Sequence, residues 1–446
     1  MIKLLKTRTD IAKQIGDAKA SLGMTVTDEE REDALRNQVT KLCKEIDLDQ
    51  STASKFLNLL LNESVKVQSE SKQTHLSVFL KAKALEEEGK KIIHLEVGEP
   101  DLKPPEEVKT ALAEVYDKGY GKYGPAKGIT ELRDELGYET NHKNIDGDNI
   151  MVCPGARFAV YLAITTLLNP GDEIIVIEPA WPAYKDCALN AGIKVRTIKT
   201  TLETGWEPSI DQINNTINEN TKMIILNYPN NPTGKILPKK LLDDIIQTAK
   251  EHDLYVLSDE IYSWYTDWAE KIEPYSSMGR ESVSWYNYEK SIITKSFSKS
   301  HAMTGFRIGY AIAEPSIIEK MSKLQALSLT NVSEPIQYVA LQALKADTSE
   351  VTEVIESRLE ALVKIAKDIG LEFVEPDGAM YLFAKTKYKN FDATKFSEKL
   401  LEHGVAIAPG EGFGDYKEFF RITAIDETKL KEGMIILDAI LKESYE

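Results

Sequence analysis

The sequence predicts an α/β protein in which a mainly parallel sheet is followed by a smaller α+β domain and preceded by an all-α helical domain. Short β-rich runs alternate with helical stretches from about residue 91, residues 1–73 contain no proline, and the last part of the chain mixes helix with strand. Strands that alternate with helices typically form a parallel sheet that is covered by helices on both faces.

Residues 1–73 are predicted to be helical throughout. In "TVTDEERE", Thr27 and Glu30 have the spacing of a capping box at the start of the second helix, and Asp49 is placed to cap the third. Apolar residues of the third helix recur at i, i+3, i+4 and i+7 from Ala53 through Phe56. This recurrence gives the helix an inward stripe and predicts a helical bundle.

Polar and charged side chains interrupt the apolar faces of these helices. They are Ser64 and Gln68 on the third helix, Arg8 and Lys19 on the first, and Asp28, Arg31 and Glu32 at the start of the second. Cations and an amide that point into a helical core favour a pocket for a small polyanion. The alternative is a bundle core in which these charges satisfy one another.

Unusual residues stand at the carboxyl ends of three β-rich runs in the next part of the chain. "NYPNNPTG" follows one run, "SDEIY" carries Asp259 on an otherwise apolar strand, and "TKSFSKSHAMTGFRIGY" puts Lys299 among small hydroxyl residues near Arg307. In an open parallel sheet, ligands bind beyond the carboxyl ends of the strands. A buried carboxylate without a partner is costly. We therefore expect one ligand to lie against all three motifs.

Pyridoxal 5′-phosphate (PLP) accounts for these motifs together. Lys299 would form the Schiff base, which requires a desolvated lysine with a lowered pKa, and Asp259 would keep the pyridine nitrogen protonated. The other expected cofactor contacts are Asn231 and Tyr262 at the phenolic oxygen, Arg307, Ser296 and Ser298 with the helix start at Gly155, Ala156 and Arg157 at the phosphate, and the ring of Trp181. Taken alone, "NYPNNPTG" is also compatible with a plain loop and Trp181 with a core aromatic.

The arrangement resembles the class I aminotransferases of PLP fold type I. "LEVGEPD", "YGPAKGITELR", "NNPTG", "DEIY", "SFSKSHAMTGFRIG" and "FFRITA" occur in the order of that family. The resemblance covers residues 76–446 and implies a seven-stranded large domain of about 121–340 with a small domain of about 76–120 and 341–446. It also implies a homodimer whose active site is completed across the interface.

The same resemblance implies roles for matching residues. Tyr123 would reach the phosphate of the neighbouring subunit, Arg421 would bind the α-carboxylate of the substrate, and the backbone at Gly98 would contact the same group. Asn231 and Trp181 would also contact the substrate, and Lys299 would move the Cα proton as base and then acid. Without the resemblance, Arg421 could equally be a surface strand residue.

The preference for a substrate side chain depends on Arg157. Some related aminotransferases carry a lysine at the matching position for the distal carboxylate, and an arginine suits a carboxylate well. Aspartate or glutamate is therefore the expected amino donor. A helix-start arginine that faces solvent is the other interpretation.

Residues 4–75 are similar to the all-helical chorismate mutases. In that family the positions matching Arg8, Lys19, Asp28, Arg31, Glu32, Ser64 and Gln68 line the site. Chorismate carries two carboxylates, and its rearrangement needs a held conformation and donors for the charge that grows on the ether oxygen. The family's first helix begins before the position matching Met1 and supplies an arginine to the partner's site. The first helix is thus expected to be truncated, and mutase activity is left open.

Together the resemblances imply an aminotransferase fused to a chorismate mutase domain, with prephenate or an aromatic keto acid as an amino acceptor. The alternative is an aromatic aminotransferase whose N-terminal domain is a non-catalytic dimerisation or effector-binding module. A β-lyase would use the same cofactor residues. A PLP-dependent transcription factor is disfavoured because residues 1–75 carry as many basic as acidic side chains and offer no basic recognition helix.

Composition narrows the partners. The 446-residue chain has a formal net charge of −16, whereas nucleic acids and anionic membranes need a basic face, so neither is expected. Small-molecule amino and keto acids, with chorismate or prephenate, are the expected ligands. The six histidines have no ligand spacing, so no metal site is expected. The charged first residues and three scattered cysteines favour a cytoplasmic location.

Overall fold

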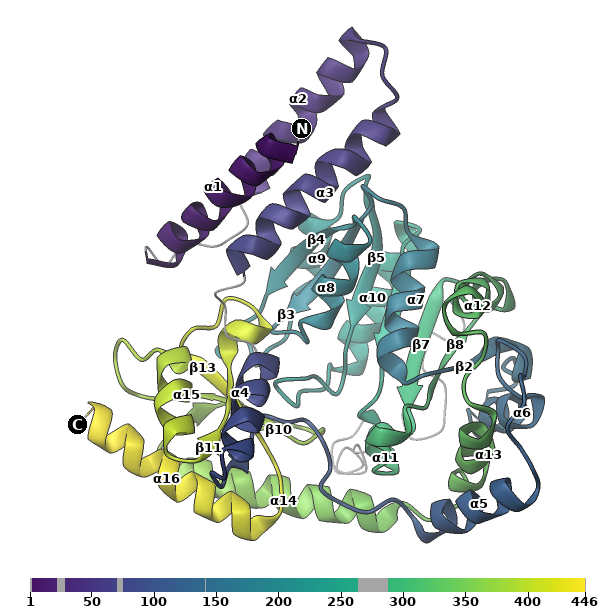
Figure 1. Cartoon of the computed structure of the whole chain (residues 1–446), viewed down its shortest axis with the longest axis vertical. Coiled ribbons are helices and arrows are strands. Elements are labelled where there is room, and N and C mark those ends of the chain that lie inside the picture. Colours follow the sequence, from purple (N-terminus) through teal and green to yellow (C-terminus); the bar gives the residue numbers. More distant parts are fainter. Residues whose placement is uncertain (1, 22–28, 70–74, 141, 264–287, 446) are drawn as a thin grey trace.

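The computed structural model describes residues 2–21, 29–69, 75–140, 142–263 and 288–445. It consists of three N-terminal helices, a large sheet flanked by helices, and a smaller lobe of strands and helices (Figure 1). Within the described residues, no helix is long and apolar enough to cross a membrane. The predicted α/β class, with a helical segment ahead of it, is confirmed.

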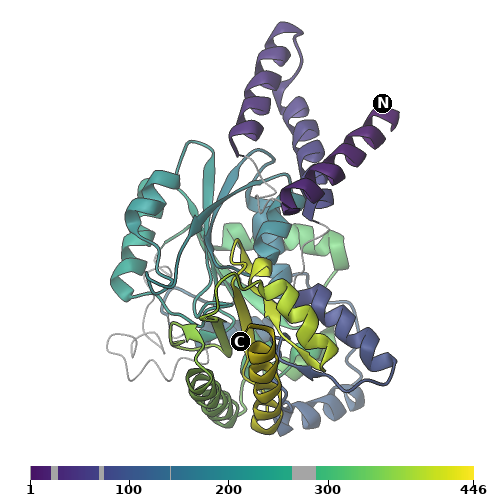
Figure 2. The same cartoon turned by 90° about the vertical axis from the view of Figure 1, so that its left-hand side faces the viewer.

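The N-terminal helices are α1 (Ile2–Ser21), α2 (Glu29–Glu45) and α3 (Gln50–Ser69), and they rise away from the rest of the molecule (Figure 2). Helices α1 and α2 both pack against α3. Asp49 caps α3 as predicted, because its carboxylate accepts a hydrogen bond from the Thr52 amide at 2.8 Å. Phe56, expected on the inward stripe, is 55% exposed because the other two helices leave that side of α3 uncovered.

The large sheet has seven strands in the order β2-β8-β7-β6-β5-β3-β4, and only β8 runs antiparallel to its neighbours. The strands are β2 (Ile150–Cys153), β3 (Glu173–Glu178), β4 (Lys194–Lys199), β5 (Thr221–Leu226), β6 (Tyr255–Asp259), β7 (Ser291–Ser296) and β8 (Gly309–Ala313). The first of the β-rich runs, "KIIHLEV" from residue 91, does not join this sheet: it forms β1 (Ile93–His94), which pairs with β11 (Val405–Ala406) of the smaller lobe. The short β2, which has no polar alternation to mark it, takes the remaining place.

Each face of the large sheet is buried by its own set of helices. The helices are α7 (Ala156–Leu167), α8 (Ala183–Asn190) and α12 (Pro315–Leu329) on one face and α9 (Ile210–Thr216) and α10 (Lys239–Glu251) on the other. Adjacent residues of β5 face opposite sides of the sheet: Ile225 packs against the first set of helices and Ile224 against the second. Both are apolar because a parallel strand covered on two faces has no solvent side. Full burial of one such side chain contributes about 1.5–3 kcal/mol.

The smaller lobe is built on the four-stranded sheet β12-β13-β10-β9. Its elements are α4 (His75–Glu87), α14 (Ser349–Asp368), β9 (Glu372–Phe373), β10 (Tyr381–Lys385), α15 (Ala393–Glu402), β12 (Ala408–Pro409), β13 (Phe419–Thr423) and α16 (Glu427–Tyr445). Leu382 and Ile422 of neighbouring strands lie in its apolar core, beneath α14, α15 and α16. In Figure 1 this lobe lies beside the carboxyl ends of the central parallel strands.

Four further helices complete the fold. They are α5 (Glu106–Asp117), α6 (Thr130–Glu139), α11 (Phe297–Ser300) and α13 (Glu334–Ala343). Helix α5 packs against α13, and Val108 and Val115 of α5 belong to the apolar core of the large sheet. The segment between β1 and α5 therefore runs from the smaller lobe to the larger one, past the site described next.

Candidate active site

A cavity of about 360 Å³ lies between the carboxyl ends of β5, β6 and β7 and the smaller lobe. Most residues that the sequence predicts for the cofactor and substrate line it. They are Gly98, Ala156, Arg157, Trp181, Asn231, Asp259, Tyr262, Ser296, Ser298, Lys299, Arg307 and Arg421. The fold thus brings together residues that come from both lobes and from more than 300 positions of sequence.

Lys299 is held on α11, which begins directly after β7. Ser296 caps this short helix by accepting a hydrogen bond from the Ser298 amide at 3.1 Å. The Lys299 ammonium is buried and donates a hydrogen bond to the Gly98 carbonyl of the segment that crosses from the other lobe. Burial lowers the pKa of Lys299 to about 8, and three arginines around the cavity add to the effect against the opposing charge of Glu99.

Asp259 is the last residue of β6 and is 3% exposed. Its carboxylate accepts hydrogen bonds from the Tyr184 hydroxyl at 2.6 Å and the Thr294 hydroxyl at 3.0 Å. Asn227 donates to the Asp259 backbone carbonyl at 2.9 Å. Burial nevertheless raises the pKa of Asp259 to about 6, because neither hydroxyl brings a positive charge. A protonated ring nitrogen would supply the missing cation.

The start of α7 and Arg307 form a cradle for an anion. Gly155 precedes α7 with φ +85° and ψ 158°, and a Cβ there would lie 2.5 Å from Nη2 of Arg307. Arg307 is fixed by a hydrogen bond from its Nη1 to the Thr304 carbonyl at 2.7 Å. The helix N-terminus, the guanidinium and the buried hydroxyls of Ser296 and Ser298 are together a donor set for a phosphate. These features fit PLP.

Arg421, on β13, is a buried cation with one donor unused. Its Nη1 donates to Asn231 Oδ1 at 2.8 Å and its Nη2 donates to the Glu96 carbonyl. Its Nε is buried and has no hydrogen-bond partner within the described part of the chain. The guanidinium lies over the rings of Tyr381 and Phe413, at 4.3 and 5.1 Å from their centroids. A carboxylate that enters the cavity would satisfy this donor.

Tyr381 joins this arginine to the expected cofactor ligands. Its hydroxyl lies 2.5 Å from that of Tyr262, and the two rings meet edge to face with centroids 5.4 Å apart. A Cβ at Gly98 would collide with the same hydroxyl, so the chain there needs glycine. The Tyr381 side chain therefore fixes the positions of Arg421, Tyr262 and the backbone at Gly98 relative to one another.

Arg157 and Trp181 lie side by side in the cavity wall. Arg157 is exposed, and its guanidinium lies 4.8 Å from the centre of the Trp181 ring. Trp181 in turn meets Tyr184 edge to face, with centroids 5.3 Å apart. The structure thus combines the two interpretations of Arg157, because its guanidinium is open to solvent and still lines the cavity.

Several lining residues were missed by sequence reasoning. They are Phe79, Glu96, Glu99, Tyr184, Asn227, Thr304 and Tyr381. Tyr184 ends the motif "PAWPAY" and is the partner that buried Asp259 requires, so the search for a donor could have found it. Glu96 stands two positions after His94 in the mostly apolar run "KIIHLEV", and this polar period of two could also have been noticed in the sequence.

Two other groups of predicted residues lie outside the cavity. Tyr123 is 89% exposed, and a single chain leaves its predicted role open. On the N-terminal helices, the Ser64 hydroxyl and the Arg8 guanidinium both donate to the Leu60 carbonyl, at 2.8 and 3.5 Å. Arg31 is exposed, Lys19 and Glu32 are half-buried, and Glu32 lies 3.9 Å from Arg36. Asp28, Thr27 and the side chain of Gln68 lie outside the described residues.

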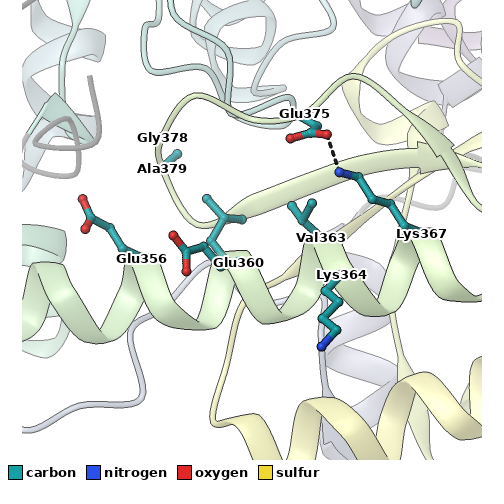
Figure 3. Close-up of a pocket in the computed structure, with 9 residues that line it drawn as sticks. Glu356, Glu360, Val363, Lys364, Lys367, Glu375, Gly378 and Ala379 are labelled. Atoms are coloured by element: carbon teal, nitrogen blue, oxygen red, sulfur yellow. Dashed lines mark hydrogen bonds and ion pairs between the residues drawn. The ribbon is translucent and has the colours of Figure 1, made fainter. Parts of the chain in front are cut away.

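A second cavity, of about 280 Å³, lies between α14 and the turn at residues 375–379 (Figure 3). Leu359, Val363 and Ala379 give it apolar walls, and Lys367 pairs with Glu375 across one end. Of its two lysines, Lys364 points away from the cavity and Lys367 is paired with Glu375, whereas Lys299 is buried among polar groups. We therefore assign the chemistry to the first cavity.

Comparison with known proteins agrees with this geometry. Residues 90–436 match the family described as aminotransferase class I and II, and residues 1–69 match chorismate mutase type II. An aspartate aminotransferase of Thermotoga maritima is 36% identical over 339 residues, which are 75% of this chain and 87% of that protein. An aspartate/prephenate aminotransferase of Thermus thermophilus is 32% identical, over 83% of this chain and 96% of that protein. The solved structure of the Thermus thermophilus aspartate aminotransferase with maleate superposes with a TM-score of 0.77 at 31% identity, covering 84% and 98% of the two chains.

Proposed function

Because the chain belongs to the class I and II aminotransferases, a family that depends on PLP, we propose that it transfers an amino group between aspartate or glutamate and a keto acid. The observation that carries this proposal is the pair of guanidinium groups, Arg421 and Arg157, that share one cavity with a lysine of lowered pKa. A dicarboxylic substrate would bind Arg421 with its α-carboxylate and Arg157 with its distal one.

The cofactor contacts follow from the donor set. Lys299 would hold PLP covalently, Asp259 would face its ring nitrogen, and Asn231 with Tyr262 would bond its ring oxygen. Arg307, Ser296, Ser298 and the start of α7 would bind its phosphate, with Tyr123 of a partner subunit in a homodimer. When bound, the cofactor withdraws electrons from the substrate Cα and carries the amino group between the two half-reactions.

The protein's own groups would then position the substrate and move one proton. Arg421, locked between two aromatic rings, fixes the carboxylate and so the direction of the Cα–H bond. Lys299, whose pKa lies near neutral pH, takes the proton from Cα and returns it as an acid. Asp259 would face the ring nitrogen and favour its protonated form, because the buried carboxylate lacks a cationic partner.

For the N-terminal helices we propose the conversion of chorismate to prephenate. The match of residues 1–69 to chorismate mutase type II supports this. Prephenate would then be an amino acceptor, an activity named for the Thermus thermophilus relative. The alternative is a helical module that dimerises or binds an effector, in an aromatic aminotransferase.

The test is to follow the visible absorbance of the purified holoenzyme while aspartate, glutamate, phenylalanine and arogenate are added singly, without an acceptor. Bleaching by aspartate or glutamate supports the dicarboxylate assignment of Arg157. Bleaching by phenylalanine alone contradicts it, and no bleaching at all directs attention to lyase chemistry. Lys299→Ala should abolish transamination and leave any mutase activity, which separates the two sites.

A further inference from the structure

Glu96 is a buried carboxylate in the wall of the cavity that none of the roles above uses. It follows β1 and is 0% exposed. One oxygen, Oε1, lies 2.8 Å from Nδ1 of His94. The other, Oε2, is buried and has no hydrogen-bond partner among the residues that the structure describes. A buried acceptor left in this state costs about 1–3 kcal/mol, and more when it is charged, so it calls for a donor.

Its contacts fix the place of Glu96. His94 lies between two carboxylates, since its Nε2 is 3.2 Å from Glu86 on α4. The hydrogen bond to Glu96 is the main cause of a raised pKa at His94, which favours the charged form of the ring. The backbone carbonyl of Glu96 accepts a hydrogen bond from Arg421. The Glu96 side chain therefore has a fixed position relative to Arg421, the residue proposed to bind the α-carboxylate.

A transamination cycle must admit two different side chains to one cavity. Arg157 suits the dicarboxylic substrate, but a distal carboxylate placed against Glu96 would be repelled. Phe79 of α4 lines the same wall, with its ring 6.1 Å from that of His94. Phe79 and Glu96 thus line the same cavity, which suits a substrate side chain that has an apolar body and a hydrogen-bond donor at its end.

We propose that Glu96 is a specificity-determining residue: its unsatisfied oxygen accepts a hydrogen bond from the second substrate, whose side chain carries a hydroxyl or an amide. The inference rests on the proposed aminotransferase function and assigns a substrate class to the same cavity. A site built around a polar contact discriminates strongly against an analogue that lacks the group, because the buried partner is then left unpaired.

The test measures binding to the holoenzyme with unreactive acids that differ by one donor. One pair is 3-(4-hydroxyphenyl)propionate and 3-phenylpropionate, and the other is succinamate and levulinate, in which a methyl replaces the amide NH₂. Affinities come from the change in cofactor absorbance or from calorimetry. We expect the donor-bearing member of one pair to bind at least about tenfold more tightly, equivalent to about 1.4 kcal/mol. A preference in the first pair identifies a hydroxylated ring, and in the second an amide.

Glu96→Gln should reduce that preference to about threefold or less, since the charged acceptor is gone. Glu86→Gln is the matched control, because it makes the same change on the other side of His94. Equal affinities within both pairs would overturn the proposal, as would an equal loss of preference in the two variants. If Glu96→Gln is poorly folded, the wild-type pairs still decide. The binding test needs no turnover, so it is independent of the bleaching test. If the holoenzyme discriminates within a pair but is bleached by neither aspartate nor glutamate, only the proposed amino donor is contradicted.

Discussion

Replacing Gly155 by alanine is expected to weaken cofactor binding about 10- to 150-fold. The backbone there has φ +85° and ψ 158°, a region that only glycine occupies readily, and another residue is strained by about 1–3 kcal/mol. The new Cβ would also lie 2.5 Å from Nη2 and 3.2 Å from Cζ of Arg307. The guanidinium must therefore move, and the loss of one hydrogen bond to a charged group amounts to about 1.5–3 kcal/mol. At 1.4 kcal/mol per tenfold, that loss gives the stated range.

The assay is a titration of the cofactor-free variant with PLP, followed by the absorbance of the bound form. Gly89→Ala is the matched control, because Gly89 has φ +89° but no atom within 4 Å of an added Cβ. It should lower the free energy of unfolding without a change in cofactor affinity. The reasoning is refuted if Gly155→Ala binds PLP as tightly as the wild type, or if Gly89→Ala loses affinity to the same extent.

Three further predictions concern buried groups of the same cavity. With a pKa of about 8, Lys299 is neutral in about one molecule in ten at pH 7, so in the cofactor-free protein it should react with a small aldehyde roughly 300-fold faster than a lysine of pKa 10.5. The pH profile of the rate constant should level off near pH 8, and a rise that continues to pH 10 contradicts the burial argument. Because the pKa of Asp259 is raised to about 6, its charge destabilises the cofactor-free fold above that pH. Asp259→Asn should therefore stabilise that form against urea at pH 7 but not at pH 4, and an equal effect at both would rule this out. Tyr381→Phe removes the 2.5 Å hydrogen bond between its hydroxyl and that of Tyr262, so it should lower the free energy of unfolding by about 0.5–1.5 kcal/mol. Succinate affinity, which is set by Arg421 and the retained ring, should be unchanged.

The sequence predicts most clearly those site residues whose charged side chains conflict with their small or apolar neighbours. Lys299 among small residues and Asp259 on an apolar strand are both costly to bury, and both line the cavity at strand ends, as the parallel topology requires. Arg421 stands on a strand with ordinary alternation, so only the family resemblance singled it out. Its guanidinium lies over two aromatic rings that are distant in sequence or brought close only by folding, so the local sequence pattern cannot predict its burial.

The sequence predicts the class of the fold, but it does not predict which segments form the strands of the large sheet. "KIIHLEV" has good strand propensity, yet β1 pairs with β11, because this run packs in the core of the smaller lobe and the chain crosses to the larger lobe only afterwards, past Gly98. In contrast, β2 is only four residues long and wholly buried, so period-two alternation could not mark it. Tyr381 could not be identified from the sequence either, because a tyrosine on an apolar strand is most simply interpreted as a core residue until its neighbours in the fold are known.

The contacts that cross the cavity also bear on the order in which the chain folds. Lys299 meets Gly98 across 201 positions of sequence, and Arg421 meets Asn231 across 190 and Glu96 across 325. Contacts of such separation form late, because a long loop must close before they stabilise anything. The large sheet, whose neighbouring strands are mostly closer in sequence, can thus be complete while the site is still open. During refolding, recovery of cofactor affinity should therefore trail the recovery of secondary structure, and the interval would expose unpaired charges that favour misassembly.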